Sequence, residues 1–448
     1  MSGIDWQRMT DEAVGHLRAL IRLNTTNPPG NELAAAKYLE SILVNEGIQC
    51  QVLEAASGRG NLVARLHGSG EERPLLLLSH LDVVPADDSH WQRPPFGGEL
   101  VDGFVWGRGA LDCKFLVVLE LMVMLLLKRE GLPLTRDVVF AATADEETGG
   151  KYGLGWLGRN HRHLLECEYA INEGGGVGLL LGGRRYYVCQ TAEKGVCWLR
   201  LRVRGEAGHA SLPTQENPVL KLARVVDRLS RARLEMRVTP TAASFLRTFA
   251  QTQKFPARLL ARGLLNRRLC PVCLPRMKVE KRIAGIVHAM LHDTATPTVV
   301  RAGELVNVVP TVAEVEVDCR LVPGQTREGF LERLRKVVGV DVEVEVALEA
   351  PGFESSHESP LYQTIADVLA EQDPGAALAP FMLTMGTDSK YLAAAGVQVY
   401  GFAPMKQEAD ASVLDMVHGH DERVSVENVG FGTKVLYEIV RRFCGQPR

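Results

Sequence analysis

A run of leucines that leads into a histidine and an aspartate constrains the fold of this chain most. Leu75–Leu78 is followed directly by Ser79, His80, Leu81 and Asp82. An apolar run of this kind predicts a strand that is buried on both faces, as in a parallel sheet. Side chains two positions apart on a strand point to the same side, so His80 and Asp82 can act together. Taken alone, the pattern also fits a core strand with a polar end.

Other apolar segments in the first half of the chain also lead into acidic residues. The predicted strand at 137–143 is followed by Glu146 and Glu147. The short apolar segment 169–172 is followed by Glu173. Neighbouring carboxylates raise one another's pKa, and a bound cation would relieve that repulsion. Because ligands of open α/β sheets bind at the carboxyl ends of the strands, these residues are expected to gather at one edge.

The most apolar stretch of the chain, 115–127, predicts a buried helix. It contains Glu120 and is too short to span a bilayer. Asp112 lies just before it, where the helix dipole favours a carboxylate. From this position alone, Asp112 is either an ordinary helix cap or a further member of the acidic cluster.

Length and composition set the outer bounds. A chain of 448 residues is too long for one ordinary core, which predicts two domains. The formal net charge of −3 gives no reason to expect nucleic acid or a membrane as a partner. Nine scattered cysteines do not resemble a disulfide framework, so reduced thiols and a cytoplasmic protein are expected. Cys270 and Cys273 form a CxxC pair without nearby ligand histidines, which favours a structural role over a zinc site.

The hydrophobic pattern changes near residue 195 and changes back near residue 348. Between these points, one-sided strands and helices alternate at 196–205, 217–231, 297–309, 312–321, 326–337 and 340–348. Their order predicts an inserted α+β domain of ferredoxin-like type at 195–347, with an additional helical, basic segment at about 240–292. The remainder, 1–194 and 348–448, is predicted to form one discontinuous α/β domain, in which helices flank a central, mostly parallel sheet.

The ordered set of motifs resembles the two-zinc metallopeptidase and amidohydrolase family. That family includes aminoacylases, bacterial glutamate carboxypeptidases, succinyl-diaminopimelate desuccinylase and carnosinases. The matching segments run from residue 79 to residue 424 and read SHLDVVP, GRGALDCK, ADEETGG, INEGG, GHAS, NVVP, DCRLVPG and HGHDERV. The chain looks nearest to the carboxypeptidase S and N-acyl-amino-acid hydrolase branch. The resemblance implies an α/β catalytic domain with an inserted lid and dimerisation domain.

The resemblance also implies a pair of divalent metal ions. Their ligands would be His80, Asp112, Glu147, Glu173 and His418. Asp112 would bridge the ions, with His80 and Glu173 on one and Glu147 and His418 on the other. This donor set suits zinc and also accommodates manganese or cobalt. His420 is the competing histidine, but the family's HxxxE spacing before Glu422 selects His418.

Further roles follow from the same resemblance. Glu146 would be the general base towards a metal-activated water, and Asp82 would orient the ring of His80. His209 would reach the site of a neighbouring subunit and stabilise the oxyanion, which implies a homodimer. The remaining substrate contacts would be Asn307, Arg320 and Gly386, with Arg320 suited to holding a carboxylate.

The expected reaction is hydrolysis of an amide or peptide bond next to a residue that bears a carboxylate. The substrate would be an N-acyl amino acid or the C-terminal bond of a short peptide. Two alternatives stay open: a dipeptidase that acts on dipeptides with free amino termini, and a non-catalytic metal-binding homologue. The complete set of ligands and the base disfavours the second alternative.

Overall fold

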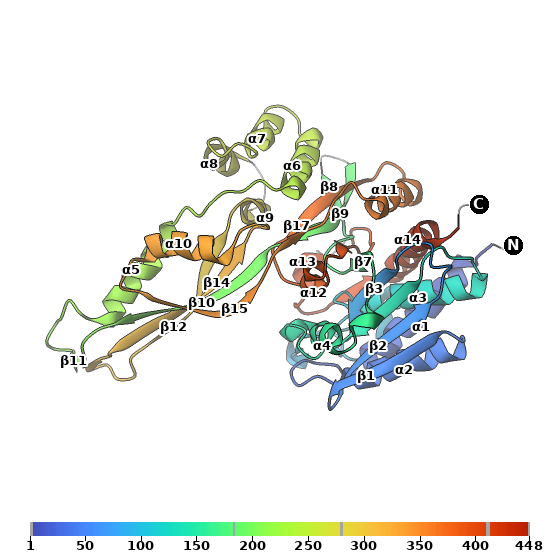
Figure 1. Cartoon of the computed structure of the whole chain (residues 1–448), viewed down its shortest axis with the longest axis horizontal. Helices are drawn as coiled ribbons and strands as arrows, with labels where there is room; N and C mark the ends of the chain where they lie inside the picture. Colours follow the sequence, from blue (N-terminus) through green and yellow to red (C-terminus); the bar gives the residue numbers. More distant parts are fainter. Residues whose placement is uncertain (1–2, 182–183, 278–280, 409–412, 447–448) are drawn as a thin grey trace. The chain divides into compact units, whose positions relative to one another are not determined.

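The structure is a computed structural model that describes residues 3–181, 184–277, 281–408 and 413–446 (Figure 1). Its chain divides into two compact units, which are described separately. Unit 1 comprises Met1–Thr191, Ser355–Phe381 and Thr387–Arg448, and unit 2 comprises Ala192–Glu354 and Met382–Gly386. Within the described ranges, no helix has both the length and the apolar character needed to cross a membrane.

The largest sheet of the described residues has ten strands, and most of it belongs to unit 1. Its main path runs in the order β1 (Gln49–Ala56), β2 (Arg59–Leu66), β6 (Val138–Thr143), β3 (Leu75–His80), β7 (Tyr169–Asn172), β18 (Gln398–Gly401), β9 (Arg184–Glu193) and β16 (Phe353–Glu354). Two further strands, β8 (Gly178–Leu181) and β17 (Ala377–Leu383), pair with β9. A separate small sheet consists of β4 (Glu99–Val101), β5 (Phe104–Trp106) and β19 (Arg423–Ser425).

The large sheet is mixed, whereas the sequence led us to expect a mostly parallel one. Strand β3 is parallel to β6 and β7, and β7 is parallel to β18. The flanking strands are antiparallel: a short turn joins β1 to β2 as a hairpin, and β8 pairs antiparallel with β9. The parallel centre fixes the site: His80 ends β3, and the residues that follow β6 and β7 emerge at the same edge.

Helices cover the sheet of unit 1 and build its core. They are α1 (Trp6–Arg22), α2 (Glu32–Asn45), α3 (Lys114–Glu130), α4 (Leu154–Asn160), α11 (Pro360–Gln372), α12 (Ser389–Ala394), α13 (Val413–Met416) and α14 (Val426–Cys444). Every residue of α3 from Lys114 to Leu127 is buried, which confirms the predicted buried helix. Its apolar side chains share one core with those of α1, α14 and β3. The helix ends at Gly131, whose positive φ of 59° suits glycine.

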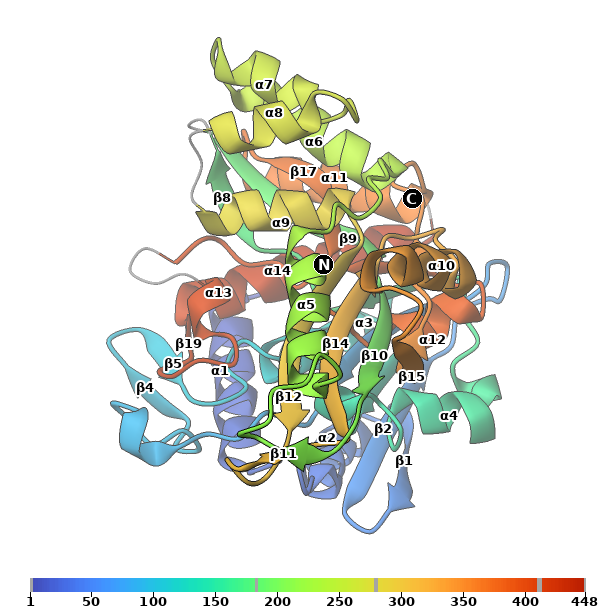
Figure 2. The same ribbon diagram turned by 90° about the vertical axis from the view of Figure 1, so that its left-hand side faces the viewer.

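Unit 2 contains a four-stranded antiparallel sheet with helices on one face (Figure 2). The strand order is β12 (Thr294–Ala302), β14 (Val312–Leu321), β10 (Gly195–Arg204) and β15 (Glu343–Ala350). Apolar residues on alternate positions of β10 and β14 pack under α5 (Pro218–Arg231) and α10 (Arg327–Val338). Unit 2 also contains a two-stranded ribbon, β11 (Gly208–His209) and β13 (Val308–Val309), and the helices α6 (Pro240–Thr252), α7 (Ala257–Gly263), α8 (Cys270–Cys273) and α9 (Lys281–Leu291).

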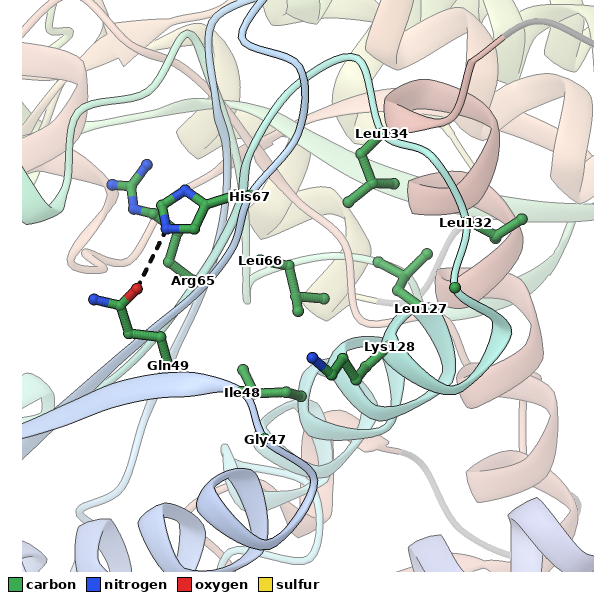
Figure 3. Close-up of a pocket in the computed structure, with 11 residues that line it drawn as sticks. Gly47, Ile48, Gln49, Arg65, Leu66, His67, Leu127, Lys128, Leu132 and Leu134 are labelled. Carbon is green, nitrogen blue, oxygen red and sulfur yellow. Dashed lines mark hydrogen bonds between the residues drawn. The ribbon is translucent and has the colours of Figure 1, made fainter.

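A cavity of about 420 Å³ lies in unit 1, between the last turn of α3 and the ends of β1 and β2 (Figure 3). Its apolar lining includes Ile48, Leu66 and Leu127, and the polar side chains of His67 and Lys128 also line it. The cavity is at the opposite end of α3 from the acidic cluster. It is therefore separate from the predicted metal residues.

Candidate metal centre

The carboxyl ends of three neighbouring parallel strands bring the predicted metal residues together. His80 is the last residue of β3, Glu173 follows β7, and Glu147 lies in the loop after β6. Leu75–Leu78 is at most 1% exposed and His80 is 2% exposed. The buried leucines therefore anchor a strand whose last side chain reaches the edge where the acidic residues gather.

Asp112 lies between two groups of potential metal ligands. One carboxylate oxygen, Oδ1, is 3.1 Å from Nε2 of His80, which in turn is 3.7 Å from Oε1 of Glu173. The other oxygen, Oδ2, is 3.1 Å from Nε2 of His418, which is also 3.1 Å from Oε2 of Glu147. The two groups thus share one carboxylate, and each group has donor atoms close enough to hold a cation.

The first group also includes a residue that the sequence analysis missed. Cys113 contributes a sulfur atom to the group of His80, Asp112 and Glu173. Burial raises the pKa of the Cys113 thiol to about 12. Because the thiolate is the form that binds metals, Cys113 would have to lose this proton to act as a ligand, whereas the carboxylates bind in their usual ionised form.

The charges around the cluster show a site with an excess of negative charge. Burial would lower the pKa of His80, but the charge of Glu173 and the hydrogen bond with Asp112 raise it well above its ordinary value. Hydrogen bonds with Asp112 and Glu147 raise the pKa of His418 to about 10. Both imidazoles therefore favour their protonated, positively charged form beside the carboxylates. A divalent cation would balance the same negative charge and would displace these protons on binding.

The carboxylate of Asp82 joins two parts of the site. Its oxygens accept hydrogen bonds from the backbone N–H groups of Glu146 (3.0 Å) and Glu147 (3.1 Å). Nδ1 of His80 lies 3.0 Å from the Asp82 carbonyl oxygen and 3.4 Å from the carboxylate. The Asp82 carboxylate therefore holds the loop that carries both glutamates. The Asp82 carbonyl oxygen, which is nearer to Nδ1 than the carboxylate is, orients the ring of His80.

Asn27 is a second residue that the sequence analysis did not identify. Its side-chain amide donates to Asp82 Oδ2 at 2.8 Å and to Asp145 Oδ1 at 3.2 Å. Asn27 is 2% exposed and comes from the loop between α1 and α2, which is rich in proline and asparagine. Its loop composition gave no sign that it contacts residues more than 50 positions away.

A buried carboxylate also fixes the chain on both sides of the second ligand group. Oε2 of Glu422 accepts from Arg108 Nη1 at 2.9 Å and from the Gly109 N–H at 3.0 Å. Its Oε1 accepts from the N–H groups of Leu111 (2.7 Å) and Asp112 (2.9 Å). Nη2 of Arg108 donates to the carbonyl of Gly419, the residue after His418, at 2.7 Å. This Arg108–Glu422 brace therefore ties the loop that carries Asp112 to the turn that carries His418.

Glu146 is placed beside the ligand groups without belonging to either of them. It is partly buried, and its backbone is held by Asp82 as described above. Burial, followed by the charge of Glu173, raises the pKa of Glu146 well above its usual value. Asp388 is a further buried acid in this region, and neither of its carboxylate oxygens has a hydrogen-bond partner within the described ranges.

The two candidate histidines near the C-terminus have different surroundings. His418 faces Asp112 and Glu147, whereas the exposed ring of His420 stacks on His90 with ring centroids 5.1 Å apart. His418 is therefore the histidine that lies beside the second ligand group, and His420 lies away from it.

The predicted substrate residues His209, Asn307, Arg320 and Gly386 lie in unit 2. The β11–β13 ribbon brings the first two together, because the Ala210 N–H donates to the carbonyl of Asn307 at 3.0 Å. Nε and Nη2 of Arg320 donate to the carboxylate of Asp318 at 2.7 and 3.0 Å. Its Nη1 faces Gly386, where an added Cβ would lie 3.8 Å away. The residues therefore form two pairs within this unit.

Comparison with known proteins assigns the family. Peptidase family M20/M25/M40 matches residues 76–442. Human N-fatty-acyl-amino acid synthase/hydrolase PM20D1 is 27% identical over 419 residues, which cover 90% of this chain and 80% of that protein. Aminoacylase-1 of Sus scrofa is 26% identical over 439 residues, which cover 96% of this chain and 95% of that protein.

Among solved structures, the M20 family metallo-carboxypeptidase Sso-CP2 from Sulfolobus solfataricus has a similar fold. The TM-score is 0.70 at 17% identity, and the match covers 96% of this chain and 98% of that chain. The family match extends over most of the sequence and includes every residue of both ligand groups, so the assignment does not depend on a single motif. The chain belongs to peptidase family M20/M25/M40 and is a hydrolase.

Proposed function

We propose that the protein is a hydrolase that uses two divalent metal ions to cleave an amide or peptide bond next to a carboxylate-bearing residue. The observation that carries this proposal is the sharing of Asp112 between two groups of ligand atoms. His80 and Glu173 would complete one metal site, and Glu147 and His418 would complete the other. The similarity to an N-fatty-acyl-amino acid synthase/hydrolase, an aminoacylase and a metallo-carboxypeptidase supports the same reaction class.

The residues present fit such ions. Three carboxylates and two imidazoles form a donor set that suits zinc and also accepts manganese or cobalt. Oε1 of Glu147 is buried and has no hydrogen-bond partner within the described part of the chain, while Oε2 faces His418. A buried carboxylate oxygen without a partner is costly, and a cation would satisfy it.

The proposed mechanism assigns a separate task to each residue. When bound, the metal ions supply Lewis-acid polarisation of the scissile carbonyl and lower the pKa of water. Glu146 takes a proton from the attacking water and passes it to the leaving nitrogen. Asp82 keeps Glu146 in place through the backbone of its loop.

We further propose that the Arg108–Glu422 brace positions Asp112 and His418 for binding the second metal ion. Changing Glu422 to glutamine turns one of its two oxygens into an amide group, which would face N–H donors. We expect metal affinity to fall by about 10–100-fold, as is typical for residues that orient metal ligands. Activity should recover when excess zinc is added, and chelator competition measures the affinity.

Glu408→Gln is the matched control for this experiment. Glu408 is also buried and accepts from the Ser425 N–H and the Asn428 amide, at 2.9 and 2.7 Å. It belongs to neither ligand group, so this variant should keep wild-type metal affinity even if its melting temperature falls. If Glu422→Gln and Glu408→Gln had equal metal affinity, the Arg108–Glu422 brace would not position the metal ligands.

For unit 2, we propose the role of a ferredoxin-like lid and dimerisation domain at about 195–347. The support is its antiparallel strand order and the placement of its two covering helices on one face. In this proposal, His209 acts at the site of a neighbouring subunit, and Asn307 and Gly386 contact the substrate. Arg320 would hold the substrate carboxylate through its free end, because Asp318 already occupies the edge formed by Nε and Nη2.

Substrate specificity is the most direct test of the proposed reaction. A panel of N-acyl amino acids, short peptides and dipeptides should be read by release of free amine. We expect N-acyl amino acids or C-terminal peptide bonds to have the highest kcat/KM. A clear preference for dipeptides with free amino termini would instead identify the dipeptidase alternative.

Arg320→Met should remove the preference for a free carboxylate. Wild-type protein should hydrolyse N-acyl amino acids about 10–100-fold better than their carboxamides, the range expected for a hydrogen-bonded charge pair. The variant should lose this ratio, mainly through KM. Arg335→Met, an exposed position on α10, is the control and should keep it. An unchanged ratio in Arg320→Met would assign carboxylate binding to another residue.

A further inference from the structure

The net charge of the whole chain conceals a strongly basic segment. Residues 240–277 contain no aspartate or glutamate, although the chain as a whole has 54 acidic and 51 basic residues. The basic residues of this segment are Arg247, Lys254, Arg258, Arg262, Arg267, Arg268 and Arg276. The segment forms α6, α7 and α8, which lie together in unit 2 (Figures 1 and 2).

All of these cationic side chains are exposed, and most have no acidic neighbour. Arg267 pairs with Glu235 at 2.8 Å. For the other six, the described ranges contain no acidic group within ion-pair distance. The positive charge of the segment is therefore available to an external anion.

Large apolar side chains are exposed next to these cations. Phe255 is 84% exposed and Leu259 is 63% exposed, and each directly follows a basic residue in the sequence. Leu269 and Val272 are about half exposed. Leu246, Phe249 and Leu264 of the same segment are buried, so the exposed apolar side chains are a separate set. We call the seven basic and four apolar exposed residues the α6–α8 surface.

We propose that the α6–α8 surface docks the protein on an anionic lipid surface. A membrane offers both partners that this surface needs: phosphate groups for the cations and an apolar interior for Phe255 and Leu259. Nucleic acid would satisfy the charges but would leave the exposed aliphatic side chains in water.

Vesicle co-sedimentation of the full chain tests the proposal. Wild-type protein should bind phosphatidylcholine vesicles that contain phosphatidylglycerol at low salt. Binding should weaken at high salt, and it should be weak on phosphatidylcholine alone. Arg258→Glu combined with Arg262→Glu should reduce binding by about tenfold or more, given the contribution of each cation near an anionic membrane. Phe255→Glu combined with Leu259→Glu should reduce it similarly.

Val340→Glu provides a matched control. Val340 is 97% exposed in the same unit but lies between α10 and β15, outside the α6–α8 surface. This variant should bind vesicles like wild type, and all variants should keep the wild-type melting temperature and hydrolyse a short soluble substrate normally. These controls separate docking from folding and catalysis.

Several outcomes would overturn the proposal. One is failure of folded wild-type protein to bind anionic vesicles at low salt. Another is a loss of binding in the arginine variant alone, which would indicate a general polyanion contact. If the Phe255 and Leu259 variant bound vesicles normally but lost activity on long-chain N-acyl substrates, the surface would be part of an acyl-binding site instead.

Discussion

Changing Glu146 to glutamine should lower kcat by about 10²- to 10⁴-fold, the usual contribution of a general acid–base group. Glutamine has nearly the same shape but cannot accept a proton from the attacking water. Glu146 belongs to neither ligand group, and its backbone bond to Asp82 does not depend on its side chain. The variant should therefore bind as much metal as wild type and show a similar KM.

The measurement combines steady-state kinetics with metal analysis of the same preparation. Glu166→Gln makes the same chemical change at an exposed position before β7 and should keep the wild-type rate. A nearly normal kcat in Glu146→Gln would exclude Glu146 as the base. A loss of metal together with activity would show that its role lies in assembling the site.

The sequence alone could predict the strand ends at the centre of the site. The apolar runs before His80 and Glu173 are buried strands, and parallel strands bring their carboxyl ends to one edge. The antiparallel flanks of the sheet were not predicted, because β1 and β9 lack the long apolar runs of the central strands. Local patterns indicate burial much better than they indicate the direction of a neighbouring strand.

The contacts that hold the site in place could not be predicted in the same way. Asn27 reaches Asp82, and Arg108 reaches Glu422 over more than 300 positions of sequence. Such polar side chains look like ordinary loop residues until the fold brings them together. The family pattern pointed to Glu422 as a spacing marker for His418, whereas its hydrogen bonds suggest a supporting role for Asp112 as well.

Complete removal of divalent metal should abolish amide hydrolysis, and zinc, manganese or cobalt should restore it. The reason is that the proposed reaction needs the metal ions to polarise the scissile carbonyl and to lower the pKa of the attacking water. The metal-free protein should also melt at a lower temperature, because ligands that bind the folded state stabilise it by mass action. Circular dichroism before and after chelation separates loss of metal from unfolding. Full activity after exhaustive chelation would rule out the proposed mechanism.

Single substitutions of the ligands should show which residues hold each of the two metal ions. Glu173→Gln is expected to weaken the site of His80, and a change of Glu147 to glutamine the site of His418. Asp112→Asn should weaken both, because its two oxygens face different histidines. Metal content under limiting zinc should therefore fall further in Asp112→Asn than in either other variant. If all three variants lost the same amount of metal, the centre would be a single site rather than a pair that shares Asp112.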